Sequence, residues 1–314
     1  MRSTMAIALW IFVFASDALA VDGVLEINHA CATSAGCFGG DAAGYPVTID
    51  GSAGRSYRLT SDLVVPDQNT DGLVVSSPGV SIDLNGFQII RSSCVGQTTS
   101  CLSIGSGVGV KVSAASIHGV SVRHGSIVGM GSDAATLGDQ AEARSLSTRW
   151  NGGNGIDAGS NAIVSHCSAS GNALGIVLGD SSTISDSVIS TTIPGTGLQV
   201  GDNAIVARNT IEHSSSTGLI AGANCFVVGN VLDSNGAGIG AGASCTVSQN
   251  SLRNNNSDGI TAGAYSRVHG NSVQNCITCL VLPATAGYSD NTLSGNASGG
   301  VNAGGNVCGG AICP

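Results

Sequence analysis

Two consecutive stretches, TGLIAGANCFVVGNVLDSNG (residues 217–236) and AGIGAGASCTVSQNSLRNNN (residues 237–256), share one pattern that decides the fold. Each has a glycine at its second position, an apolar residue directly after it, and an asparagine twelve residues after the glycine. The same position recurs at spacings of 20 to 22 residues, at Gly155, Gly175, Gly197, Gly218, Gly238, Gly259, Cys279 and Gly300. A fixed period of this length is typical of a solenoid, in which each repeat forms one coil.

The asparagines of the repeat indicate how the coils stack. They form one column, at Asn209, Asn230, Asn250, Asn271 and Asn291, and a second column with gaps, at Asn151, Asn172, Asn235, Asn255 and Asn296. Stacked strands lie about 4.8 Å apart, a distance at which side-chain amides hydrogen-bond along the axis. We therefore interpret the asparagines as structural residues at inward-turning corners.

The remaining positions of the repeat predict strands. Apolar residues alternate with polar ones over short segments, glycines separate these segments, and no stretch keeps apolar residues at helical spacing. The sequence therefore predicts an all-β fold, a single-stranded parallel β-helix with about 21 residues per coil and roughly eleven coils.

The N-terminus indicates an exported protein, and the net charge limits its partners. Residues 1–20 contain Arg2, an apolar run over residues 6–15 and a small-residue site at residues 18–20, a pattern that predicts a secretory signal peptide. No later segment is apolar enough to predict a membrane span. The net charge of -9, with Lys111 as the single lysine, argues against nucleic acid and anionic membranes as partners. We expect a periplasmic, cell-surface or extracellular location, and the oligomeric state stays open.

All 11 cysteines follow the predicted signal peptide, which favours disulfides. Four close pairs are expected to pin loops and ends: Cys31 with Cys37, Cys94 with Cys101, Cys276 with Cys279, and Cys308 with Cys313. Cys225 and Cys245 share one repeat position, which places their α-carbons within disulfide distance and leaves Cys167 over. The odd number of cysteines permits other pairings. Zinc is the alternative, but suitably spaced histidines are missing, so we predict no metal site and no cofactor.

The less regular segments divide the chain. Residues 21–60 are expected to form an N-terminal cap, residues 61–299 the β-helix, and residues 300–314 a C-terminal cap. An insertion over residues 91–107 interrupts the early coils. Caps are expected because an exposed terminal coil is an open sheet edge.

The segment IDLNGF (residues 82–87), followed by coils that begin NGI (residues 154–156) and continue to Gly159, resembles a known family. It is similar to right-handed parallel β-helix proteins of the pectate-lyase-like superfamily, in the style of the NosD-type and carbohydrate-binding short-coil domains. The resemblance covers residues 55–300 and implies a right-handed coil. It also implies an extracellular polysaccharide as ligand or substrate, although the sequence motifs of alginate epimerases and polygalacturonases are missing.

Two groups of side chains are candidates for chemistry. His166, Asp186 and Arg208 occupy the same position in successive coils, so they are expected to form a row on the outer surface. In such a row a carboxylate orients the imidazole and the guanidinium binds an anionic sugar; the alternative is an exposed charge ladder between neighbouring strands. Arg149 and Trp150 are candidates for stacking on a sugar ring, with an exposed aromatic of no consequence as the alternative.

We therefore predict a protein that binds or processes an extracellular polysaccharide. Whether it is an enzyme stays open, and a lyase, a hydrolase or an epimerase would each fit. An enzyme predicts a walled groove near residues 91–150 with converging ionisable groups. The rival prediction is a structural or adhesive surface protein without catalysis, which would be a smooth and nearly neutral rod.

Overall fold

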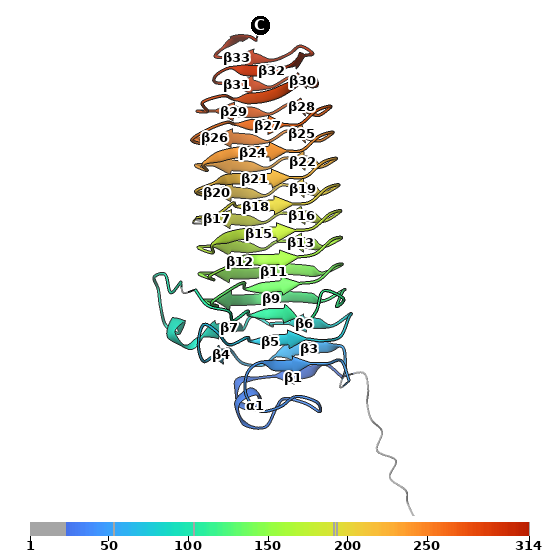
Figure 1. The fold of residues 1–314 in the computed structure, drawn as a ribbon. Coiled ribbons are helices and arrows are strands. Elements are labelled where there is room, and N and C mark those ends of the chain that lie inside the picture. Colours follow the sequence, from blue (N-terminus) through green and yellow to red (C-terminus); the bar gives the residue numbers. More distant parts are fainter. Residues whose placement is uncertain (1–22, 53, 103, 191, 193, 314) are drawn as a thin grey trace, which may run out of the picture.

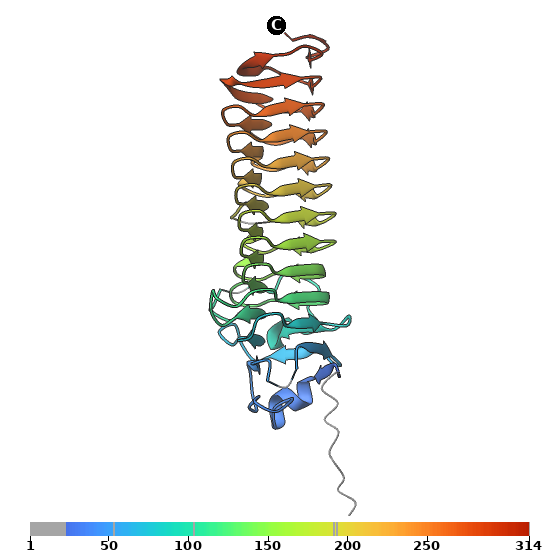
Figure 2. The ribbon, with the colours of Figure 1, turned by 90° about the vertical axis from the view of Figure 1, so that its right-hand side faces the viewer.

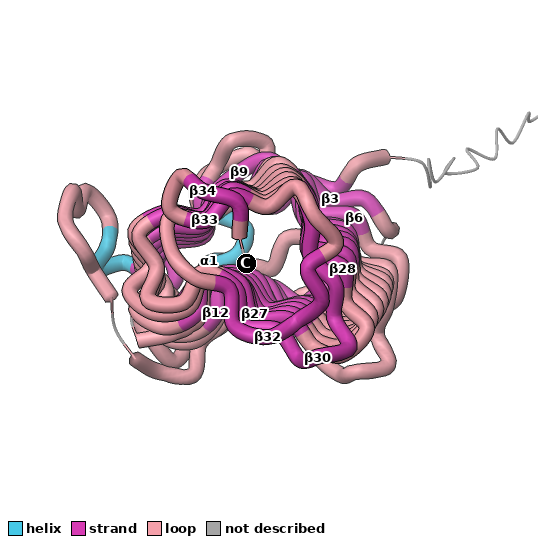
Figure 3. Tube along the Cα trace, turned by 90° about the horizontal axis from the view of Figure 1, so that it is seen from above, coloured by secondary structure: helices cyan, strands magenta, loops and turns pink. Residues whose placement is uncertain are grey.

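The structure, a computed structural model, describes residues 23–52, 54–102, 104–190, 192 and 194–313. The predicted signal peptide lies outside the described residues. The chain winds into a right-handed parallel β-helix of about eleven coils, with roughly 21 residues between stacked strands (Figures 1 and 3). The predicted all-β solenoid is confirmed.

Each regular coil contributes one short strand to each of three parallel sheets, which we call face 1, face 2 and face 3. Face 1 contains β2 (Val47–Ile49), β5 (Leu73–Val75), β8 (Val110–Val112), β10 (Ala135–Leu137), β12 (Asn154–Ala158), β15 (Leu174–Leu178), β18 (Leu198–Val200), β21 (Thr217–Ala221), β24 (Ala237–Ala241), β27 (Ile260–Ala262), the start of β30 (Leu280–Ser289) and β32 (Ala297–Asn302).

Face 2 contains β1 (Leu25–Ile27), β3 (Ser56–Leu59), β6 (Ser81–Asp83), the first parts of β9 (Ser121–Val128) and β11 (Glu142–Arg149), β13 (Ile163–Ser165), β16 (Thr183–Ser185), β19 (Ile205–Ala207), β22 (Phe226–Val228), β25 (Thr246–Ser248), β28 (Arg267–His269) and the end of β30. Face 3 contains β4 (Leu63–Val65), β7 (Gln88–Arg91), the second parts of β9 and β11, β14 (Ser168–Ser170), β17 (Val188–Ser190), β20 (Thr210–Glu212), β23 (Val231–Asp233), β26 (Ser251–Arg253), β29 (Ser272–Gln274), β31 (Thr292–Leu293) and β33 (Val307–Cys308), which pairs with the antiparallel β34 (Ala311–Ile312).

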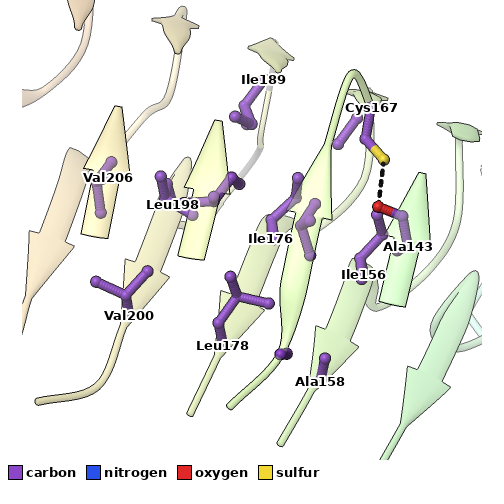
Figure 4. Packing of buried hydrophobic residues seen from close by; sticks show 14 of the residues in the cluster. Ala143, Ile156, Ala158, Cys167, Ile176, Leu178, Ile189, Leu198, Val200 and Val206 are labelled. Atoms are coloured by element: carbon purple, nitrogen blue, oxygen red, sulfur yellow. Dashed lines mark hydrogen bonds between the residues drawn. The ribbon is translucent and has the colours of Figure 1, made fainter. Parts of the chain in front are cut away.

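The strands form because their apolar positions alternate and stack into one continuous core. Ile156, Ile176 and Leu198 are direct partners in neighbouring coils, and each is fully buried (Figure 4). Burial of a side chain of this size stabilises the fold by roughly 1.5–3 kcal/mol relative to its exposed state. Polar side chains that alternate with the apolar ones therefore lie on the outside of the coil.

The corner between face 2 and face 3 is a single residue with left-handed backbone. It is His166 (φ 55°), Asp186 (φ 53°) and Arg208 (φ 56°) in three successive coils. A non-glycine residue in this region costs on the order of 1 kcal/mol. This residue turns the chain through the bend. The residue after it points inward, and from Asn209 onward that residue is the asparagine of the column.

The asparagine next to this corner satisfies the backbone of the bend. Asn250 is buried, and its Oδ1 accepts the backbone N–H of Asn230 (2.9 Å) and the Nδ2–H of Asn230 (3.0 Å). Its Nδ2 donates to the carbonyl oxygen of Val227 (3.0 Å) and to Oδ1 of Asn271 (3.0 Å). Equivalent bonds connect the column from Asn209 to Asn306.

Four disulfides join the four close cysteine pairs that the sequence predicts. Cys225 and Cys245 are instead buried free thiols, as is Cys167. Proximity of their α-carbons is not sufficient, because stacked residues project their side chains in the same direction. Their β-carbons then stay about 4.8 Å apart, beyond the usual 3.8 Å of a disulfide.

Two short helical segments lie outside the regular coils. Helix α1 (His29–Ser34) lies at the N-terminal end of the solenoid (Figures 1 and 2), and the 3-10 turn η1 (Ser92–Cys94) opens the inserted loop over residues 91–107, which projects at one side of the rod (Figure 3). Within the described ranges, neither segment has the length or apolarity of a membrane-crossing helix.

Candidate functional site

A hollow of about 360 Å³ lies where the inserted loop folds against face 3, and we call it the Trp150 hollow. Strands β4, β7, β9 and β11 supply one side and the loop over residues 94–98 supplies another. It is lined by Asp62, Val64, Gln88, Ile90, Cys94, Val95, Gly96, Gln97, Thr98, Val128, Arg149 and Trp150. The hollow therefore lies in the region where the sequence predicts a walled groove, and it contains both predicted sugar-stacking residues.

Trp150 is held in the hollow by its backbone and by its neighbours. It is a left-handed corner residue (φ 57°), and its ring lies over Gly171 of the next coil, where an added β-carbon would be 2.7 Å from Cδ1. The ring packs on a small apolar cluster of Ile90, Cys94 and Val128 that is separate from the main core. The half-buried indole thus has a structural role and also presents its surface to the hollow.

Polar side chains lie beside Trp150 at the rim of the hollow. The guanidinium of the exposed Arg149 lies 5.5 Å from the centre of the Trp150 ring, a cation–π distance. Asp62 is exposed, and its Oδ1 accepts the backbone N–H of Gln88 (2.9 Å), which fixes the carboxylate beside the Gln88 side chain. An apolar ring with a few fixed donors and acceptors is the usual construction of a small-ligand site.

The loop that forms one wall is anchored twice. The Cys94–Cys101 disulfide closes it, and the Arg91 side chain beneath it donates to the carbonyl oxygen of Cys101 and lies 3.4 Å from Sγ of Cys94. Arg91 is only 5% exposed, and this burial lowers the pKa of its guanidinium. Its Nε has no hydrogen-bond partner among the described residues.

The predicted row of His166, Asp186 and Arg208 lies elsewhere, along the corner between face 2 and face 3. Arg208 binds Asp186 through two contacts, Nε to Oδ1 (2.7 Å) and Nη2 to Oδ2 (2.8 Å). Hydrogen bonds from Arg208 and Ser185, with charge from Arg208 and His166, lower the pKa of Asp186 to about 2. These three residues are absent from the lining of the Trp150 hollow, so the structure does not bring the two predicted groups together.

A second hollow of about 350 Å³ on face 1 contains acidic residues that the sequence analysis did not single out. Asp139, Asp157 and Leu137 contribute to its lining. Burial raises the pKa of Asp157, and the charge of Asp133 raises it further. Asp133 accepts the hydroxyl of Thr136 (2.9 Å) and the backbone N–H of Asn154 (2.6 Å), so its position is fixed.

No metal centre is built from these acids. Among the residues that the structure describes, no three His, Cys, Asp or Glu side chains are grouped so as to hold a metal ion.

No protein-family model matches the chain, and no curated protein matches it. Similar solved structures include the Dettilon tailspike protein (13% identity, TM-score 0.47, 82% of this chain and 57% of that chain). They also include the periplasmic alginate epimerase AlgG (14%, 0.41, 85% and 75%) and an alginate lyase from Paenibacillus sp. str. FPU-7 (12%, 0.39, 90% and 98%). This chain spans little more than half of the length of the tailspike.

Proposed function

We propose that this chain is an exported β-helix protein that binds an extracellular polysaccharide at the Trp150 hollow. One observation carries the proposal: a half-buried tryptophan faces a hollow that also contains Asp62, Gln88 and Arg149. A sugar ring has apolar faces and hydroxyls on its edge, so it fits an aromatic surface bordered by hydrogen-bonding groups.

The hollow is also organised before any ligand arrives. The disulfide and Arg91 fix the loop wall, and contact with Gly171 fixes the indole. Ordering of loops and side chains is one of the main free-energy costs of binding, so a fixed wall favours affinity.

Export is part of the proposal for two reasons. Four disulfides are typical of proteins outside the reducing cytoplasm. The sequence of residues 1–20 predicts a signal peptide, which would carry the chain to such a compartment.

A second candidate function is hydrolysis of the bound polysaccharide at the face 1 hollow. Asp139 and Asp157 both line this hollow, and burial raises the pKa of Asp157. A pair of carboxyl groups in one recess is the arrangement that glycoside hydrolysis uses as acid and base.

The test is binding of the purified protein to a glycan array, compared with two variants. Trp150→Ala removes the stacking surface, and Tyr265→Ala is the matched control, because Tyr265 is also an aromatic left-handed corner residue and is 75% exposed. We expect glycan binding that is lost in Trp150→Ala and kept in Tyr265→Ala. Equal binding by all three proteins would place the site elsewhere.

Silence of the folded protein across neutral and acidic glycans would contradict the proposal and favour a structural or adhesive protein. Product analysis on any bound polysaccharide then separates binding from catalysis. Chain shortening that stops in Asp157→Asn would support hydrolysis at the face 1 hollow, and an unchanged polymer would leave a binding protein.

A further inference from the structure

Most basic side chains of this acidic protein have a carboxylate partner, usually on the neighbouring coil. The pairs are Arg58 with Glu26 (4.0 Å), Lys111 with Asp71 (2.5 Å), Arg123 with Asp83 (3.2 Å), Arg144 with Glu142 (2.6 Å), Arg208 with Asp186 (2.7 Å) and Arg253 with Asp233 (2.9 Å). Among the described residues, four arginines lie outside this pairing: Arg55, Arg91, Arg149 and Arg267.

Two of these four arginines lie near the Trp150 hollow, Arg149 in its lining and Arg91 behind its loop wall. In the described part of the chain, the ion pairs include neither Arg91 nor Arg149. Arg149 lies at the rim over the indole, and Arg91 lies directly behind the loop wall, in contact with Cys94 and the Cys101 carbonyl. The lining of the hollow therefore has one positive charge without a bound carboxylate, Arg149, and one negative charge, Asp62, while the charge of Arg91 is buried behind the loop wall.

We infer that the sugar bound at this hollow carries an anionic group, a carboxylate or a sulfate, that pairs with Arg149. The inference rests on the proposed function and names the substrate class of that same site. A guanidinium presents a planar set of donors that fits two oxygens of a carboxylate or sulfate at once. With one face of Arg149 toward the indole, the donors at its edge are the ones left for the ligand.

Arg91 acts through its charge rather than by contact, since it does not line the hollow. Its guanidinium is buried with the unpaired Nε, and water screens a buried charge poorly. The resulting positive potential favours an anion in the hollow. A neutral sugar would leave the charge of both arginines uncompensated.

Matched ligands test the inference. A polyuronate oligosaccharide is compared with its carboxyl-reduced form, and a sulfated oligosaccharide with its desulfated form, by titration calorimetry at low and high salt. We expect one anionic form to bind roughly 10- to 100-fold more tightly than its neutral counterpart, which is the effect of one charge-assisted contact. Only the anionic form should weaken with salt.

Variants assign that difference to the hollow. Arg149→Gln is expected to abolish the preference for the anionic form, and Arg149→Lys to keep part of it. Asp62→Asn is expected to strengthen anion binding severalfold, because it removes the opposing charge. Both positions are exposed, so circular dichroism should show unchanged folding.

The outcomes separate the two claims. Equal affinity for charged and neutral forms, with binding lost in Trp150→Ala, would overturn the anionic class and leave the proposed function intact. No binding of any form by the folded protein would overturn both. An anionic preference that survives Arg149→Gln would also overturn the inference, because another residue would then bind the anionic group of the sugar.

Discussion

Replacing Asn250 by alanine tests the account of how the coils are held together. The change removes the partner of the buried Asn230 backbone N–H and of the Val227 carbonyl oxygen. A buried polar group without a partner costs about 1–3 kcal/mol, so the two together predict a loss of about 2–6 kcal/mol in the free energy of unfolding. Domains are stable by only about 5–15 kcal/mol, so the effect should be large.

The matched control is Asn256→Ala, the same chemical change at an exposed position on the next stretch of chain. Its effect should stay within about 0.5 kcal/mol, as for other surface substitutions. Urea unfolding followed by circular dichroism gives both values, and amide exchange shows whether the coils around Asn250 open first, as a solenoid permits. If Asn250→Ala unfolds at the same urea concentration as Asn256→Ala, the asparagine column does not stabilise the rod.

Two further predictions concern the hollows. Replacing Cys94 and Cys101 by serine should loosen the loop wall and weaken glycan binding, with little change in the unfolding of the rod, because the cluster under the loop is separate from the main core; calorimetry and a melting curve check both parts. Asp157→Asn should raise the melting temperature at pH 7 but not at pH 3. The pKa of Asp157 is raised above its ordinary 3.8 in the folded chain, so its stabilising contribution is present below that value and is lost as the pH rises through the folded-state pKa. A melting temperature of Asp157→Asn below that of the parent at pH 7 would refute this account.

The sequence predicts the rod well because its information is periodic. Glycine, apolar and asparagine positions return every 20 to 22 residues, and each return is a stacking contact in the coil. The direction in which side chains at the corners point is harder to predict from the sequence. Cys225 and Cys245 occupy stacked positions as expected, yet parallel side chains keep them as thiols.

Only part of the candidate site could be predicted from the sequence. Trp150 and Arg149 can be singled out by residue type, but Asp62 and Gln88 join them only because a non-periodic loop folds back on face 3. Asp157 did leave a signal that we missed. It occupies an outward position of a face 1 strand that the later regular coils fill with uncharged residues, at Val177, Gln199, Ile220, Gly240 and Thr261.

The separation of the small cluster under the loop from the main core has a consequence for engineering. Ile90 of β7, Val128 of β9 and Cys94 at the start of the loop pack together outside the continuous interior of the coils. We therefore expect the rod to fold without the loop that the Cys94–Cys101 disulfide closes, and this loop to tolerate changes in length and composition. A loop of different sequence grafted between residues 91 and 107 should therefore alter what the protein recognises without redesign of the scaffold.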